Sequence, residues 1–214
     1  MPSRRVLLLG ATGLVGSEVL RLLLADDSFE RVVVLTRRPT GYTHARLDEH
    51  ILDLDEMEQH RNAFAVDAIL CALGTTIRVA KTKERFRHVD HDLPLLAARL
   101  GLANGATHYL LVSSLGADPK SRVFYNRVKG EVEADLLALP YPKITIVRPS
   151  FLVGPRPEFR LGEQIVTRLG WLMPPRIRPI DSRVVARALV ALAKREEDGA
   201  RIIESRELRA VAAV

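Results

Sequence analysis

Short apolar runs alternate along the chain with stretches in which apolar residues recur at helical spacing. The apolar runs are rich in Val, Ile and Leu, as in strands that are buried on both faces of a sheet. The predicted strands are residues 5–10, 31–38, 67–74, 107–116 and 143–150, with weaker candidates within 44–54 and at 201–205. The predicted helices are residues 14–27, 81–102, 123–134 and 182–196.

This alternation predicts a single α/β domain over residues 1–214, built as a Rossmann-type doubly wound sheet with mostly parallel strands. The pattern breaks at residues 151–180, where repeated prolines leave one short helical stretch near 162–170. Ligands of open α/β sheets bind outside the carboxyl ends of the strands. We therefore expect 151–180 to be an irregular segment that covers the substrate side of a cleft.

A glycine pattern follows the first predicted strand directly. In "GATGLVG", Gly10, Gly13 and Gly16 lie between that strand and the first helix. A turn of this kind lets backbone N–H groups and the helix N-terminus approach a pyrophosphate. The spacing is one residue longer than G-x-G-x-x-G, and glycines also occur in turns for steric reasons alone. Its place at the first strand–helix junction predicts nucleotide binding.

The end of the second predicted strand indicates which dinucleotide is bound. An NAD site usually carries Asp or Glu there, whereas this chain has "LTRRP" with Arg37 and Arg38. Guanidinium groups suit a 2′-phosphate because they donate several hydrogen bonds in a planar fork. The alternative is a solvated strand end. With the glycines upstream, the two arginines predict NADP(H).

Tyr125 and Lys129 lie one turn apart in "VFYNRVKGEVEA", so their side chains leave the same face of the predicted helix. The pair suits acid–base chemistry because the ammonium favours the phenolate form of the tyrosine. A plain helix surface is the alternative. The predicted strand ending in Ser113 and Ser114 comes just before this helix, which favours the chemical interpretation.

Several stretches recur together in one order: "GATGLVG", "LTRRP", "CALGTT", "VDHDLP", "VSSLGAD", "FYNRVKGEVEA" and "RPSFLVGPR". Through them, nearly the whole chain resembles the short-chain dehydrogenase/reductase superfamily. It is most similar to the atypical branch that includes the Tat-interacting protein and its bacterial relatives. In that branch the active-site residues do not guarantee turnover.

The resemblance implies a role for particular residues. The catalytic set would be Tyr125, Lys129 and Ser114, or its neighbour Ser113, with Ser113, Tyr125 and Lys129 also contacting the cofactor. Further cofactor contacts would be Gly10, Thr12, Gly13, Leu14, Val15 and Gly16 at the phosphates; Arg37 and Arg38 at the 2′-phosphate; Asp53 near the adenine; Leu73, Gly74 and Thr75 along the adenosine and ribose; Arg148, Pro149 and Ser150 beside the nicotinamide; and Arg156 close to cofactor or substrate.

Two functions are consistent with these features. One is an NADP-dependent oxidoreductase that acts on a small carbonyl or alcohol by hydride transfer, assisted by the Ser, Tyr and Lys side chains. The other is a non-catalytic NADPH-binding regulator that binds a protein partner. We expect a small-molecule substrate and a monomer or homodimer.

Composition excludes some other classes of protein. The net charge is +6, but the arginines are spread along the chain and aromatic residues make up only 5%, so we expect no nucleic-acid partner. No apolar run approaches the length of a membrane span. The lone Cys71 lies in an apolar run and needs no disulfide. The N-terminal "MPSRRVLLLGATG" superficially resembles a signal peptide, but its apolar part is short and leads into the glycine pattern, so we predict a cytoplasmic protein.

"RHVDHD" raises the question of a metal site, because His88 and His91 share one helix face. No further ligands accompany them, so we predict helix-surface polarity and no metal. "WLMPPRIRP", residues 171–179, fits a substrate pocket, a partner contact or plain core packing equally well.

Overall fold

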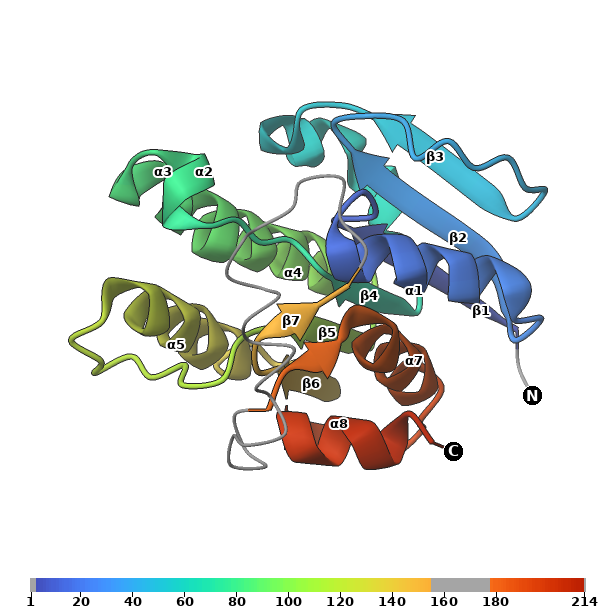
Figure 1. Cartoon of the computed structure of the whole chain (residues 1–214). Helices are drawn as coiled ribbons and strands as arrows, with labels where there is room; N and C mark the ends of the chain where they lie inside the picture. The colour runs from blue at the N-terminus through green and yellow to red at the C-terminus, as the bar shows by residue number, and fades with distance from the viewer. Residues whose placement is uncertain (1–2, 155–177, 214) are drawn as a thin grey trace.

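A seven-stranded sheet, all of whose strand pairs are parallel, forms the centre of the protein (Figure 1). The computed structural model describes residues 3–154 and 178–213. The strands lie in the order β3-β2-β1-β4-β5-β6-β9. Their bounds are β1 Arg4–Leu9, β2 Phe29–Thr36, β3 Leu47–Ile51, β4 Ala68–Cys71, β5 His108–Val112, β6 Lys143–Arg148 and β9 Gly199–Glu204. This arrangement confirms the predicted doubly wound α/β fold.

Helices cover both faces of the sheet because its central strands, β1, β4 and β5, are apolar on both sides. In β1, Val6 and Leu8 pack into one core, while Leu7 and Leu9 pack into the other. The first core lies against α1 Leu14–Ala25, α7 Ser182–Ala193 and α8 Ser205–Val211, and the second against η1 Leu54–Phe64, α4 Leu93–Ala103 and α5 Phe124–Leu137. The 3₁₀ helix η1 and the helix α8 were not predicted from the sequence.

The helix predicted over 81–102 is instead interrupted. It comprises α3 Lys83–Arg87, the π-helical turn η2 His88–Asp92, and α4, and the short helix α2 Ile77–Ala80, which was not predicted, precedes it. Pro94 explains the π turn, since it has no N–H to donate to the carbonyl of Asp90. The N–H of Leu93 donates instead to the carbonyl of His88, five residues back.

Residues at the two ends of the proline-rich segment pair with each other. β7 Leu152–Val153 is parallel to β8 Ile180–Asp181 and forms a separate two-stranded sheet. The short helical stretch predicted near 162–170 and most of "WLMPPRIRP" lie outside the described residues. Within the described parts of the chain, no helix has the length and apolar character that a membrane crossing requires.

Candidate active site

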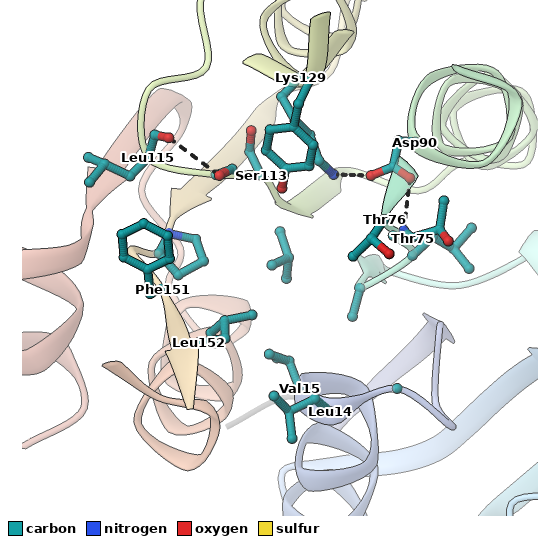
Figure 2. A pocket seen from close by; sticks show the side chains of 18 of the residues that line it. Leu14, Val15, Thr75, Thr76, Asp90, Ser113, Leu115, Lys129, Phe151 and Leu152 are labelled. Carbon is teal, nitrogen blue, oxygen red and sulfur yellow. Dashed lines mark hydrogen bonds and ion pairs between the residues drawn. The ribbon is translucent and has the colours of Figure 1, made fainter. Parts of the chain in front are cut away.

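A cleft of about 920 Å³ opens at the carboxyl ends of the central strands (Figure 2). The strand order reverses between β1 and β4, and the loops after these two strands form opposite walls of the cleft. Such a reversal leaves a crevice, because the following helices cross to opposite faces of the sheet. The loops after β5 and β6 complete the walls.

The loop after β1 turns so tightly that only glycine fits at two of its positions. Gly10 has φ +82°, and a Cβ there would lie 2.5 Å from the carbonyl oxygen of Ala72. A Cβ on Gly16 would overlap the carbonyl of Gly10. These two glycines therefore bring β1, α1 and β4 together, and they support the cleft without lining it.

Gly13 differs from the other two glycines because it faces the cleft. It is the N-cap of α1, and a Cβ there would meet only the carbonyl oxygen of Gly10, at 3.2 Å. No side chain caps α1, and its first turn carries no acidic residue. The positive end of a twelve-residue helix thus opens into the cleft beside Gly13, Leu14 and Val15. This cradle fits a dinucleotide pyrophosphate.

The arginines after β2 lie at another wall of the cleft. Arg38 lines it, whereas Arg37 is exposed outside it. The Thr36 hydroxyl donates to the Arg38 carbonyl over 2.8 Å and fixes the turn. Among the described residues, neither guanidinium forms an ion pair. Asp53 lies apart from the cleft, where its side chain caps η1.

The two serines after β5 have different surroundings. Ser113 is buried, and its hydroxyl donates to a carboxylate oxygen of Glu133. Glu133 also accepts hydrogen bonds from Arg148, which in turn pairs with Glu204 at 3.3 Å. Ser114 is less buried, and its hydroxyl donates only a long bond of 3.3 Å to the neighbouring Leu115 carbonyl. Ser114 is therefore the serine whose hydroxyl is available to a ligand.

Helix α5 carries Tyr125 and Lys129 into the cleft opposite these serines. The loop after β5 approaches α5 closely because Gly130 has no side chain: a Cβ there would overlap the backbone of Asp118. The Asp118 N–H donates to the carbonyl of Asn126 over 3.0 Å. The Tyr125 ring packs against Phe86 with ring centroids 5.4 Å apart. These contacts hold the tyrosine at the cleft wall.

Lys129 is buried beside a carboxylate that the sequence analysis did not identify as a site residue. Its Nζ lies 2.7 Å from Oδ1 of Asp90, and Oδ2 of Asp90 accepts the Thr75 N–H over 2.8 Å (Figure 2). Burial lowers the pKa of Lys129, whereas the charges of Asp90 and then Tyr125 raise it by more. The pKa of Lys129 therefore lies above its usual value. The lysine is held as an ammonium.

The expectation of helix-surface polarity in "RHVDHD" is wrong for two of its residues. Asp90 is 1% exposed and His91 is 6% exposed, whereas His88 and Asp92 reach solvent. Asp90 lies one helical turn after the buried Phe86, and His91 lies one turn before the buried Leu95, so both occupy the inward face of this helical stretch. That spacing was the available signal. The described residues contain no group of three or more His, Cys, Asp or Glu side chains placed to hold a metal ion.

The structure brings most of the predicted site residues to the cleft and leaves the others around it. Arg148 lies outside the cleft in its ion pairs with Glu133 and Glu204, and Arg156 lies outside the described residues. Gly10, Thr12, Gly16, Arg37 and Asp53 also do not line it. The predicted residues that line it are Gly13, Leu14, Val15, Arg38, Leu73, Gly74, Thr75, Ser113, Ser114, Tyr125, Lys129, Pro149 and Ser150.

Comparison with known proteins agrees with this geometry. Residues 5–89 match the family model of the semialdehyde dehydrogenase NAD binding domain. The chain is 33% identical to rat HTATIP2, covering 81% of this chain and 73% of that protein. It is 32% identical to Eremothecium gossypii FMP52, covering 94% of each.

Solved structures with the same fold are more distant in sequence. MoeE5 in complex with UDP-glucuronic acid and NAD matches with a TM-score of 0.74 and 18% identity, over 92% of this chain and 75% of that one. Bordetella bronchiseptica WbmG in complex with NAD matches with a TM-score of 0.73 and 14% identity, over 99% of this chain and 76% of that one.

The relatives correct one prediction. Several of them, including the Candida albicans and Coccidioides immitis proteins, are named mitochondrial FMP52 proteins. The prediction of a cytoplasmic protein is therefore contradicted. A lone buried thiol indicates only a reducing environment, and more than one compartment provides one.

Proposed function

This chain belongs to the HTATIP2 and FMP52 family, within the short-chain dehydrogenase/reductase superfamily of NAD(P)-binding oxidoreductase-like proteins, and on that basis we propose that it is an NADP-dependent oxidoreductase acting on a small carbonyl or alcohol. The observation that carries the proposal is the meeting of Ser114, Tyr125 and Lys129 in one cleft with the glycine loop. Residues from three separate segments converge there with the chemistry of a hydride-transfer site.

Each of the three side chains has a distinct task in this mechanism. A nicotinamide cofactor held in this cleft would supply the hydride-transfer chemistry. Tyr125 gives its phenolic proton to the substrate oxygen in reduction and takes it back in oxidation. Ser114 donates a hydrogen bond to that oxygen and orients it. Lys129, held as an ammonium, stabilises negative charge on the tyrosine and binds the ribose hydroxyls.

We assign the serine role to Ser114 and not to Ser113. The hydroxyl of Ser113 is already donated to the buried Glu133. Breaking that bond would leave a buried carboxylate with one fewer donor, which costs free energy. Ser113 instead fixes the loop that carries Ser114.

The cofactor preference rests on Arg38. Its guanidinium lines the cleft without an ion-pair partner among the described residues, so it is available to a 2′-phosphate. Arg37 adds positive charge from outside the cleft. A ribose 2′-hydroxyl gains less from two cations than a dianionic phosphate does, which favours NADP(H) over NAD(H).

We extend the proposal to residues 151–180 and to the whole chain as one domain. Phe151, Leu152 and Val153 line the cleft where the segment begins. Arg178 and Ile180 mark its described end, and Ile180 pairs with Leu152. The described ends of this segment therefore lie at or beside the cleft, and residues 155–177 lie outside the described parts of the chain; that the segment covers the substrate is part of the proposal.

The test is turnover after Tyr125→Phe, which removes one oxygen and keeps the ring against Phe86. The substrate is found by screening aldehydes and ketones for NADPH oxidation. We expect kcat to fall by about 10²–10⁴-fold, as when a general acid is lost, with NADPH affinity and melting temperature unchanged. Tyr42→Phe is the matched control, since Tyr42 is exposed outside the cleft. Wild-type kcat in Tyr125→Phe contradicts the proposal.

A second function, an NADPH-binding regulator without turnover, is favoured by the apolar rim of the cleft. Val79 is 62% exposed and Phe151 is 63% exposed, and both line the cleft mouth. A protein partner that covers this rim would sense whether the cofactor is bound. The absence of turnover in a broad carbonyl screen, together with tight NADPH binding, favours this function.

A further inference from the structure

Asp90 is a carboxylate in the cleft wall to which the proposed mechanism assigns no task. It is 1% exposed, and burying a charge is costly unless the charge is paired. Its two oxygens face two different groups of the site: the Lys129 ammonium at 2.7 Å and the Thr75 N–H at 2.8 Å (Figure 2). It lies in the π-helical turn η2, one helical turn after the buried Phe86.

We propose that Asp90 is a positioning residue that neutralises the Lys129 ammonium in the free protein, keeps Tyr125 in its phenol form, and so makes the site a proton donor suited to carbonyl reduction. This inference rests on the proposed function for the direction of reaction. The effect on Tyr125 itself is a property of the chain and can be measured without a substrate.

The charges around the ion pair of Lys129 and Asp90 support this assignment. An isolated ammonium would strongly favour a neighbouring phenolate, but an ammonium with a carboxylate at 2.7 Å is a neutral dipole whose field falls off faster with distance. From β4, Cys71 faces the pair, and burial raises the pKa of its thiol, so it stays neutral. From α3, Phe86 contributes only an apolar ring. Asp90 is therefore the group that offsets Lys129.

The same carboxylate also couples two parts of the site. Lys129 belongs to α5, while Thr75 belongs to the loop after β4, and each contacts a different oxygen of Asp90. The proposed mechanism assigns Lys129 to the cofactor ribose, and the family resemblance implies that Thr75 lies along the adenosine and ribose. One residue thus fixes the distance between the helix and the loop.

Tyrosine ionisation gives a direct assay, because tyrosinate absorbs near 295 nm. The chain has four tyrosines. Burial raises the pKa values of Tyr109 and Tyr141, so neither ionises in the accessible range. In a Tyr42→Phe background, the absorbance rise between about pH 8 and pH 11 then reports Tyr125.

In that background, Asp90→Asn leaves the ammonium uncompensated and should lower the midpoint of the absorbance rise by about one pH unit. The double variant Asp90→Asn with Lys129→Gln removes both charges and should return the midpoint to within about 0.3 units of the parent. Asp92→Asn is the matched control, since it removes an equal charge from the same turn at an exposed position. It should leave the midpoint unchanged.

An unchanged midpoint in Asp90→Asn overturns the inference, and so does an equal shift in Asp92→Asn. If Asp90→Asn does not fold, Lys129→Gln alone should raise the midpoint, because the Asp90 carboxylate then faces the phenol unopposed; no rise overturns the inference. A shifted midpoint without carbonyl turnover in any screen refutes the proposed function and leaves the electrostatic role of Asp90 standing.

Discussion

Adding one methyl group at Gly13, the N-cap of α1, or at Gly16, in its first turn, separates binding from stability. In Gly16→Ala the new Cβ would lie 2.7 Å from the carbonyl carbon of Gly10 and closer still to its oxygen. These are backbone atoms of a residue with φ +82°, which has little freedom to move. Overpacking costs about 1–3 kcal/mol, and the helix propensity of alanine offsets at most about 1 kcal/mol of it. We expect Gly16→Ala to lose about 2 kcal/mol of unfolding free energy.

Gly13→Ala should instead weaken NADPH binding and leave the unfolding free energy nearly unchanged. Gly13 has φ −84° and ψ 171°, a conformation open to alanine, and its Cβ would meet only the Gly10 carbonyl oxygen at 3.2 Å. The unfolding free energy should change by less than about 1 kcal/mol. The methyl group would stand in the cleft at the N-terminus of α1, so NADPH should bind at least about tenfold more weakly, or about 1.4 kcal/mol.

Urea unfolding and calorimetric titration with NADPH measure the two effects separately. The reasoning about the pyrophosphate cradle is refuted if Gly13→Ala binds NADPH as tightly as the parent. The reasoning about the tight turn is refuted if Gly16→Ala is as stable as the parent, since the loop would then have relaxed around the methyl group.

Two further predictions concern cofactor choice and acid stability. Arg38→Ala should reduce the calorimetric preference for NADPH over NADH by about 1–3 kcal/mol, and Arg37→Ala by less, because only Arg38 lines the cleft; equal affinity of the parent for both cofactors would refute the preference. Burial, then Lys143 and Arg4, lower the pKa of His108 from 6.5 to about 4. The unfolded state therefore takes up a proton before the folded state does as pH falls, so stability declines below about pH 6.5, and His108 should make unfolding about 2 kcal/mol easier at pH 5 than at pH 7.5. Urea unfolding at both pH values, with His108→Gln as the variant that should lose this difference, measures the effect.

The sequence alone was sufficient for the features that depend on local pattern. Apolar runs located the sheet strands within a few residues, because a strand buried on both faces must be apolar throughout. The spacing of Gly10, Gly13 and Gly16 predicted the strand–helix turn, since Gly10 takes a left-handed backbone conformation and Gly16 leaves no room for a side chain. The spacing of Tyr125 and Lys129 placed both on one face of α5, and the structure brings both to the cleft.

Only the tertiary structure decided the features that depend on partners far apart in the chain. Ser113 and Ser114 are equivalent in sequence, and the carboxylate of Glu133 distinguishes them. Arg148 ends β6, within the strand predicted over 143–150, but Glu133 and Glu204 hold it outside the cleft. Asp90 shares an inward helix face with Phe86, but its partner Lys129 comes from α5, a separate element. Periodicity fixes which way a side chain leaves its own helix or strand, whereas the charge it meets there is set by how separate elements pack.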